Sequence, residues 1–383
     1  MKIAIPKERL PGETRVAASP DVVKKLVGLG FDVIVEKDAG TISSFIDDEY
    51  KAAGATIAKD AATALGEADV VFKVQRPIAE GDKSEVPLFK KGAIVIATMN
   101  AVLNKKDMEA YAAAGLTTFA MELMPRISRA QTMDVLSSQS NLAGYKSVLD
   151  GAAEFGSAFP MMMTAAGTIA PAKVFIMGAG VAGLQAIATA KRLGAVVTAY
   201  DVRPTVKEQV ESLGGKFVEV DEEATKEAET SGGYAKEMGD DFKKKQAQVT
   251  HDHLKKQDIV ICTALIPGKP APVLITEDMV KDMKPGSVIV DLAVEMGGNC
   301  PLSKLGKVIV KHGVKIVGHD NVPGRLPKDA SALYGKNLLN FITPHVDAES
   351  KALNFNWEDE TVTGTLITRD GKVVNPAVTG EGN

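Results

Sequence analysis

Residues 173–183 read KVFIMGAGVAG, and this stretch decides the fold. It begins as an apolar run typical of a buried strand, and Gly178, Gly180 and Gly183 follow in the spacing GxGxxG. In such a turn the first glycine permits a tight bend, the second lets the backbone approach a pyrophosphate, and the third lets helix and strand pack closely. The N-terminus of the helix that follows favours an anion. We therefore predict a strand, a dinucleotide-binding turn and a helix.

The residues after the turn strengthen this prediction. A helical pattern at 184–193 ends at Gly194, and the next apolar run is followed by Asp201, about 20 residues beyond the turn. A carboxylate at that place accepts hydrogen bonds from ribose hydroxyls and repels a 2′-phosphate, so NAD(H) is favoured over NADP(H). Arg203 could accommodate that phosphate, but we favour its interpretation as a solvated loop cation.

Beyond this stretch, strand and helix patterns alternate in both halves of the 383-residue chain. The first half has apolar runs at 2–5, 32–36, 70–74, 93–97 and 116–120. The second half has them at 174–177, 195–200, 258–263, 287–292 and 314–317. A chain of this length exceeds the size at which one hydrophobic core stops growing. We predict an α/β fold of two Rossmann-like domains with parallel sheets and a cleft between them.

The connections between the two series indicate the domain boundaries. Apolar residues recur at helical spacing through 127–159, so a helix is expected to link the domains. Near the C-terminus, Asp370-Gly371 lies between two short apolar runs and predicts a hairpin, which we expect to return to the first domain. The predicted domains are a discontinuous N-terminal one, 1–140 with 325–383, and a nucleotide-binding one, 141–324.

Two other segments have unusual composition. Residues 219–245 combine acids, paired glycines around Tyr234 and a closing run of lysines, and we predict a mobile loop near 221–245. Met161-Met162-Met163 is interpreted as packing in a core or between the two domains, because methionine fills irregular apolar gaps.

Composition excludes several functional classes. The net charge is −4 with both signs interspersed, so no broad basic field exists for nucleic acid. Cys262 and Cys300 are too few for a disulfide framework or a zinc site, and we interpret both as packing residues without any metal. The most apolar long stretch, 158–172, is interrupted by prolines and glycine, so direct membrane insertion is not expected.

Five stretches together resemble the NAD(H)-binding component of proton-translocating, Si/Re-specific NAD(P) transhydrogenases. They are 121–145, 173–216, 232–239, 263–272 and 284–301. The resemblance covers essentially the whole chain, and alanine dehydrogenase is a more distant relative with the same two-domain plan. It implies hydride transfer between NAD(H) on this chain and NADP(H) on a partner domain. It also implies membrane-spanning partner subunits, a homodimer, and a peripheral position at the cytoplasmic or matrix-equivalent face of the inner membrane.

The resemblance also assigns residues around the reacting ring. It implies that Arg126, Asp134 and Ser137 surround the nicotinamide carboxamide, while Gln131 reaches the partner's nucleotide. A carboxamide has an acceptor and donor hydrogens, so a guanidinium and a carboxylate with a hydroxyl can fix its orientation. From spacing alone an equally good alternative remains, in which Asp134 and Ser137 only satisfy the backbone at a helix start.

The resemblance further implies a set of nucleotide neighbours. Tyr234 matches a residue at the tip of a loop that closes over nucleotide, although an ordinary exposed loop aromatic is the alternative. Leu265 follows a strand's carboxyl end, where such sheets bind ligands, although a core leucine explains it equally well. The remaining neighbours are Ile127, Ser128, Arg129, Val181, Val202, Arg203, Gly233 and Gln246.

Two other functions compete with this one. In an alanine dehydrogenase-like enzyme a carboxylate substrate is held by a cationic pair, and Arg15 and Lys73 resemble that pair. That reaction needs an acid/base group, and Met99 stands where that family carries its catalytic histidine. A nucleotide-sensing module would use the same fold without chemistry.

Overall fold

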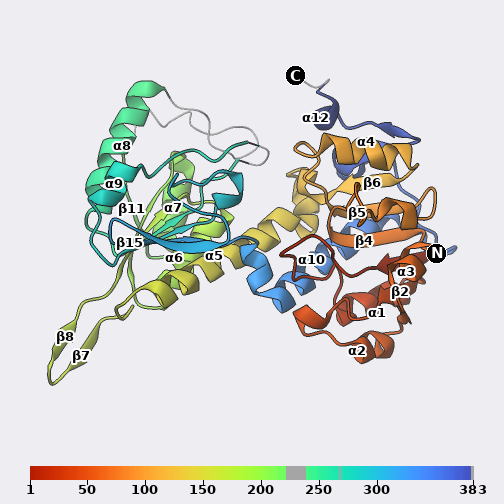
Figure 1. Cartoon of the computed structure of the whole chain (residues 1–383), viewed down its shortest axis with the longest axis horizontal. Coiled ribbons are helices and arrows are strands. Elements are labelled where there is room, and N and C mark those ends of the chain that lie inside the picture. Colours follow the sequence, from red (N-terminus) through yellow and green to blue (C-terminus); the bar gives the residue numbers. More distant parts are fainter. Residues whose placement is uncertain (221–238, 267–268, 381–383) are drawn as a thin grey trace. The chain divides into compact units, whose positions relative to one another are not determined.

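The computed structural model of the chain describes residues 1–220, 239–266 and 269–380. Two compact units form: unit 1 comprises Met1–Gln139 and Gly324–Asn383, and unit 2 comprises Ser140–Pro323 (Figure 1). The boundaries predicted from the sequence lie next to this division. The chain first passes from unit 1 to unit 2 between Gln139 and Ser140, inside helix α5 (Val135–Glu154). Within the described ranges, no helix combines the length and apolarity needed to cross a membrane.

Unit 1 is built on an eight-stranded sheet with the order β17-β16-β6-β5-β4-β1-β2-β3. The strands are β1 Lys2–Ile5, β2 Asp32–Glu36, β3 Thr56–Ala58, β4 Val70–Gln75, β5 Ile94–Thr98, β6 Thr117–Ala120, β16 Leu366–Arg369 and β17 Lys372–Val373. The first six pair in parallel, whereas β16 runs antiparallel to β6 and to β17. The C-terminal hairpin therefore returns to the first sheet as predicted. Asp370 and Gly371 both have positive φ, as its tight turn requires.

Helices cover both faces of this sheet, because successive strand residues point to opposite sides. Ile3 and Ile5 belong to one buried cluster, which includes residues of α1 and α10, and Ala4 belongs to another, which includes residues of α3 and α4. The helices are α1 Pro20–Gly28, α2 Asp47–Ala52, α3 Ala61–Leu65, α4 Lys105–Ala113, α10 Pro327–Ile342, α11 Glu360–Thr365 and α12 Pro376–Thr379. At the start of α1 the Ser19 side chain accepts a hydrogen bond from the Val22 N–H, and this cap stabilises the first turn.

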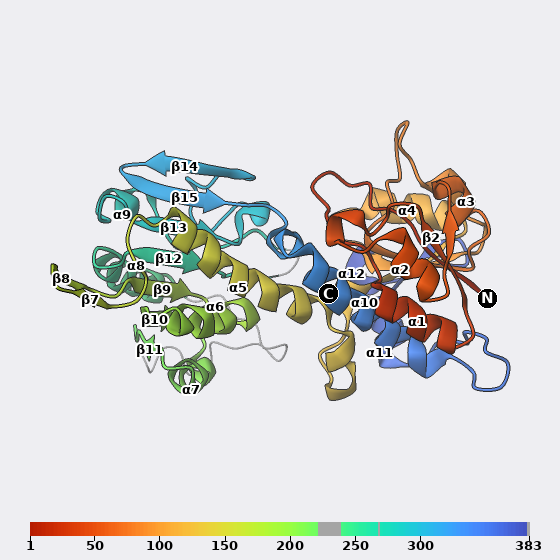
Figure 2. The same cartoon turned by 90° about the horizontal axis from the view of Figure 1, so that it is seen from below.

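Unit 2 is built on a seven-stranded sheet with the order β11-β10-β9-β12-β13-β15-β14 (Figure 2). The strands are β9 Lys173–Met177, β10 Val196–Tyr200, β11 Lys216–Phe217, β12 Ile259–Cys262, β13 Val288–Asp291, β14 Lys307–Lys311 and β15 Val314–Gly318. All neighbours are parallel except β14 and β15. The chain leaves β9 toward β10 on one side and later returns to β12 on the other. The predicted α/β fold with parallel-dominated sheets is confirmed.

Helices also cover both faces of the second sheet. Val174 and Ile176 belong to a buried cluster that includes residues of α5 and α6, whereas Phe175 and Met177 belong to one that includes residues of α8 and α9. The helices beyond α5 are α6 Val181–Arg192, α7 Lys207–Ser212, α8 Asp240–Leu254 and α9 Glu277–Lys281. Cys262 and Cys300 are free and fully buried in the second cluster, as their packing interpretation predicts.

Helix α8 corrects the predicted extent of the mobile loop. The last residues of the interval 221–245 are helical, because α8 begins at Asp240. Phe242 and Thr250 are buried, and Gln246 and Val249 are partly buried between them, which is helical spacing along one face. Gly233 and Tyr234 lie outside the described residues.

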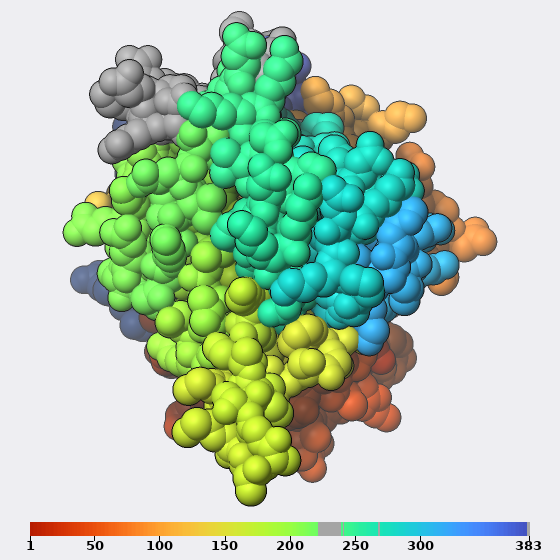
Figure 3. All heavy atoms as spheres, turned by 90° about the vertical axis from the view of Figure 1, so that its left-hand side faces the viewer, coloured from red at the N-terminus to blue at the C-terminus, as the bar shows by residue number. Residues whose placement is uncertain are grey.

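A short hairpin corrects the interpretation of the methionine run. Within the described residues, strands β7 (Met162–Thr164) and β8 (Gly167–Ile169) pair only with each other, and every residue from 160 to 170 is exposed. Met163 is 77% exposed, so the run does not pack in the core of this chain. The yellow atoms of this segment project from the rest of unit 2 in Figure 3.

Candidate functional site

The glycine turn between β9 and α6 has little room within the protein at its first and third positions. Gly178 has φ +102°, and a Cβ there would lie 2.6 Å from the Thr263 hydroxyl oxygen. A Cβ on Gly183 would lie 1.9 Å from the carbonyl oxygen of Gly178. Strand, turn and helix can therefore pack only with glycine at these two positions. This is the context that a GxGxxG sequence needs to form a dinucleotide turn.

The second glycine is different. Gly180 is the N-cap of α6 and has φ −77°, which any residue adopts, and a Cβ there would meet no atom of the described residues within 4 Å. Protein packing therefore does not explain the glycine. Its open side adjoins the N-terminus of α6, where the free N–H groups and the helix dipole favour an anion. Val181, the first residue of α6, is 42% exposed at the same place.

Sheet order places this turn where open α/β sheets bind ligands. Strand β9 lies between β10 and β12, so the connections on its two sides run in opposite directions across the sheet. The carboxyl end of β9 is therefore a topological switch point. Thr263 follows β12 and donates a hydrogen bond from its hydroxyl to the Gly178 carbonyl oxygen at 3.0 Å. This residue was missed from the sequence, although its place just after a central strand was a usable signal. Leu265, two residues on, is 41% exposed, so its interpretation as a core leucine is wrong.

Asp201 follows β10 and joins the turn directly. Its carboxylate accepts a hydrogen bond from the Ala179 N–H at 2.8 Å, and the residue is only 9% exposed. The Arg203 guanidinium donates to both carboxylate oxygens, at 2.9 and 2.8 Å. The interpretation of Arg203 as a solvated loop cation is therefore wrong, because this bidentate pairing holds it against Asp201. Val202 between them is partly buried against the cluster that contains Phe175.

The residues assigned to the nicotinamide lie in unit 1, around a 3-10 helix and the start of α5. Asp134 precedes α5 and accepts hydrogen bonds from the N–H of Ser137 at 2.9 Å and from its hydroxyl at 2.5 Å. Asp134 therefore caps the start of α5, and the capping bond contributes about 1 kcal/mol. It also fixes the carboxylate and the hydroxyl in one orientation. Both can then contact a further polar group without reorganising.

Other residues of this segment are exposed. The 3-10 helix Ser128–Met133 carries Gln131, and both Gln131 and Arg126 are exposed. Ile127 is partly buried and packs against the core of unit 1, whereas Ser128 is exposed. Arg129 makes a bidentate ion pair with Asp359 at 2.9 and 3.0 Å. The Arg129 hydrogen bonds lower the pKa of Asp359.

Comparison with known proteins then places the chain. The model for the alanine dehydrogenase/PNT C-terminal domain matches residues 147–376, and that for the N-terminal domain matches residues 4–143. The chain belongs to the alanine dehydrogenase/PNT family. It is 68% identical over 383 residues to an NAD(P) transhydrogenase subunit alpha polypeptide of Rhodospirillum rubrum, covering 100% of both chains.

Other members of the family are similar at greater distance. A solved transhydrogenase structure from Sinorhizobium meliloti shares 53% sequence identity and has a TM-score of 0.88, covering 98% of this chain and 100% of that one. "Alanine dehydrogenase 2" of Staphylococcus aureus is 32% identical over 349 residues, covering 89% of this chain and 86% of that protein. The family therefore includes both enzymes that compete in the sequence analysis.

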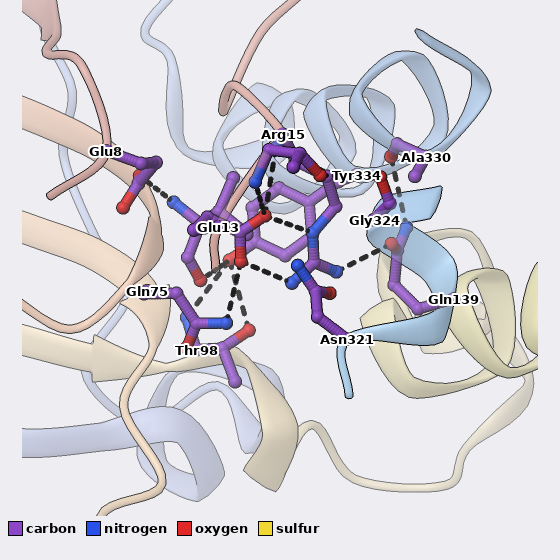
Figure 4. A network of polar contacts seen from close by, with 12 residues as sticks. Glu8, Glu13, Arg15, Gln75, Thr98, Gln139, Asn321, Gly324, Ala330 and Tyr334 are labelled. Carbon is purple, nitrogen blue, oxygen red and sulfur yellow. Dashed lines mark hydrogen bonds and ion pairs between the residues drawn. The ribbon is translucent and has the colours of Figure 1, made fainter. Parts of the chain in front are cut away.

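Both cations that suggest an alanine dehydrogenase-like member, Arg15 and Lys73, pair with the chain's own carboxylates. Figure 4 shows Arg15 against Glu13. Arg15 is 8% exposed and donates to both oxygens of Glu13 at 2.8 and 2.7 Å. Its Nη1 donates to the side-chain oxygen of Gln139. Burial opposes ionisation of Glu13, but the hydrogen bonds and charge of Arg15 outweigh it and lower the pKa of Glu13. Gln75 donates to the same carboxylate at 2.9 Å.

The second cation, Lys73, is also paired with carboxylates of the chain. Lys73 is 1% exposed and lies 2.9 Å from a Glu85 oxygen and 3.4 Å from a Glu8 oxygen. Burial raises the pKa of Glu8 to about 6, although the Lys73 charge opposes this shift. Met99 is fully buried, and its thioether has no titratable proton, so this position supplies no acid/base group. A substrate carboxylate would have to displace buried ion pairs, which is costly.

Proposed function

We propose that this chain is the NAD(H)-binding component of a proton-translocating, Si/Re-specific NAD(P) transhydrogenase. One observation carries the nucleotide site in this proposal: among the described residues, a Cβ would clash with protein at Gly178 and Gly183 but not at Gly180, where a pyrophosphate must approach the backbone closely. The match to the relative from Rhodospirillum rubrum along the whole chain supports the same function. The nucleotide binds through Gly178, Gly180, Val181 and Gly183 at its pyrophosphate and Asp201 at its ribose. Val202, Arg203, Gln246 and Leu265 act as further neighbours, with Gly233 and Tyr234.

The chain's own contribution to the reaction is orientation. Bound NADH supplies a hydride from its ring, and NADP⁺ on the partner domain accepts it. Arg126 and the Asp134–Ser137 pair hold the carboxamide, while Gln131 reaches the partner's nucleotide; Ile127, Ser128 and Arg129 complete the segment. Direct hydride exchange requires close approach of two ring carbons and exclusion of water, and no proton shuttle. This agrees with a buried Met99 and with cations already neutralised by Glu13 and Glu85.

The partners follow from what the reaction still needs. The NADP(H) site and the path for protons are assigned to other subunits, one binding NADP(H) and one spanning the membrane. The chain then lies peripherally at the cytoplasmic or matrix-equivalent face of the inner membrane. Its net charge of −4 offers no broad basic surface for nucleic acid.

Replacing Asp201 should alter the choice of nucleotide. In Asp201→Asn the carboxylate that repels a 2′-phosphate is lost and Arg203 is released from its ion pair, so NADH should bind about tenfold more weakly and NADPH more tightly. Fluorescence titration with both nucleotides measures the change. Asp258→Asn is the matched control, because Asp258 also accepts a backbone N–H, that of Lys173, at 2.8 Å. An unchanged NADH-to-NADPH preference in Asp201→Asn would contradict the assignment.

We assign the exposed hairpin to a homodimer contact. A two-stranded hairpin is marginal in water on its own. The hairpin nevertheless exposes Met163 and Ile169 at 77% and 43%, and Met161, just before β7, is 60% exposed. Serine at all three positions should weaken self-association at least about tenfold, since each buried apolar side chain is worth about 1.5–3 kcal/mol. Sedimentation velocity against concentration measures this. Val310→Ser, which removes an apolar side chain 62% exposed elsewhere in unit 2, is the control. Equal self-association of the triple variant and the control would show that the hairpin is not part of the homodimer contact.

A single assay separates the three candidate functions. The chain is mixed with NADH and an oxidised NADP analogue, with and without a recombinant NADP(H)-binding partner domain. A transhydrogenase component reduces the analogue only when the partner is present. Pyruvate and ammonia are then added in place of the analogue. Oxidation of NADH under those conditions would instead identify an alanine dehydrogenase, and binding without either reaction would identify a nucleotide sensor.

A further inference from the structure

One buried side chain, that of Asn299, holds the segment that follows β12. Its Oδ1 accepts a hydrogen bond from the Ala264 N–H at 3.2 Å, and its Nδ2 donates to the Ala264 carbonyl oxygen at 2.9 Å. Nδ2 also donates to the Pro272 carbonyl oxygen at 2.8 Å. The amide thus grips the backbone of Ala264 from both sides and links it to Pro272. Both donors and the acceptor of the side chain are used.

Asn299 is itself held firmly. It is fully buried, and its N–H donates to the buried carboxylate of Asp291 at 3.1 Å. The same carboxylate accepts the N–H of Cys300 at 3.0 Å and the hydroxyl of Ser303 at 2.7 Å. The preceding Gly298 has φ +84°, and a Cβ there would lie 2.7 Å from an Asp291 oxygen. The turn is therefore anchored at the end of β13 and presents the amide in one orientation.

The segment gripped by Asn299 adjoins the glycine turn. A Cβ on Gly178 would lie 3.2 Å from the backbone nitrogen of Ala264, so the two backbones are in close contact. The neighbouring Thr263 hydroxyl donates to the Gly178 carbonyl oxygen. On the other side of Ala264, Leu265 is 41% exposed. Asn299 therefore fixes the backbone of Ala264. That backbone lies against Gly178 and precedes Leu265, the exposed residue assigned to the nucleotide.

We propose that Asn299 is a positioning residue for NAD(H), acting through Ala264 on the Gly178 turn and on Leu265. This inference rests on the proposed function, because it needs a nucleotide at that turn. The amide touches no nucleotide itself. A backbone held by hydrogen bonds at both its N–H and its carbonyl group loses little freedom when a ligand binds. The affinity for NADH therefore depends on these hydrogen bonds. In a folded variant, loss of the amide should leave the backbone of Ala264 less firmly held beside the Gly178 turn.

The test compares Asn299→Ala and Asn299→Ser with Ser303→Ala. Asn299→Ser keeps a small neutral polar side chain whose single hydroxyl hydrogen cannot replace both donated bonds, and it serves if the alanine variant does not fold. Ser303→Ala removes a bond to Asp291 from the same turn without touching Ala264. NADH affinity is measured by fluorescence titration, thermal stability by circular dichroism, and KM and kcat by hydride transfer with the partner domain.

The expected result is a split between binding and turnover. A folded Asn299 variant should show about a tenfold higher dissociation constant and KM for NADH, with kcat at saturating NADH unchanged, because the reacting ring is held elsewhere. Ser303→Ala should keep the wild-type affinity whatever its stability. An affinity within twofold of wild type in both Asn299 variants would overturn the inference, as would an equal loss in Ser303→Ala. Absence of NADH binding in the wild-type chain would refute the proposed function itself.

Discussion

Alanine at position 180 is expected to weaken NADH binding about 100-fold while leaving the melting temperature unchanged. Within the part of the chain that the structure describes, a Cβ at Gly180 meets no atom within 4 Å, and alanine readily adopts a φ of −77°. Stability therefore gives no reason for glycine here. A pyrophosphate seated against the turn would occupy the space that the methyl group fills, and the loss of close backbone approach removes several charge-assisted hydrogen bonds. Isothermal titration calorimetry and thermal denaturation of the same samples measure the two effects.

Two further glycine variants make this prediction specific. Gly156→Ala also adds a methyl group with nothing within 4 Å, but away from the turn, and should change neither affinity nor stability. Gly183→Ala should lower both, because its Cβ would clash with the Gly178 carbonyl oxygen at 1.9 Å. Wild-type affinity in Gly180→Ala would show that the open side of the turn does not hold a nucleotide.

Arg126→Ala is expected to reduce kcat for hydride transfer about 100-fold, with NADH affinity changed less than about threefold. Arg126 is exposed in unit 1 and is assigned to the nicotinamide carboxamide. Loss of that contact leaves the ring free to rotate, and misorientation lowers the rate of hydride transfer far more than binding. Stopped-flow measurement with the partner domain, at saturating NADH, separates kcat from KM.

An arginine from the same unit provides the control for that variant. The Arg369 guanidinium lies 3.8 Å from the Trp357 ring centroid, in a stack that has no assigned part in the reaction. Arg369→Ala should retain the wild-type kcat. If Arg126→Ala transfers hydride as fast as Arg369→Ala, the carboxamide is oriented by other groups and the assignment of Arg126 is wrong.

The elements that were predictable from the sequence are those whose signal is local. Strands β1 and β2 match the predicted ranges 2–5 and 32–36, because a buried parallel strand is a short continuous apolar run. Strand β14 was not predicted: it lies at a sheet edge and carries Lys307 and Lys311 at its ends, which is how exposed edges are protected. The hairpin β7–β8 was missed because its methionines suggested burial, whereas here they face solvent.

In the site, too, the features predictable from the sequence are those with a local signal. The Gly178–Gly183 turn and Asp201 were predictable because their spacing along the chain determines the strand, turn and helix that bring them together. The Arg203–Asp201 pair depends on which way a long side chain turns, and spacing does not determine that. Asn299 lies 35 residues from Ala264 in sequence, and only the sheet order brings their segments together. Polar contacts between distant segments leave no periodic pattern in a sequence.

Family membership alone does not choose between the enzymes, because both share the fold. The distinguishing features are particular side chains. Arg15 and Lys73 remain, yet Glu13 and Glu85 pair with them inside unit 1. Met99 is buried and cannot shuttle a proton. The same framework therefore favours a reaction in which orientation suffices and no substrate carboxylate is held.

Isotope transfer tests the central claim most directly. NADH deuterated at the transferring position of the ring is mixed with NADP⁺, this chain and the partner domain in ordinary water, and the product NADPH is analysed by mass spectrometry. Direct transfer between two nicotinamides predicts that NADPH carries the deuterium undiluted and that none forms without this chain. Loss of the label to water, or NADPH formation that does not need this chain, would contradict the account.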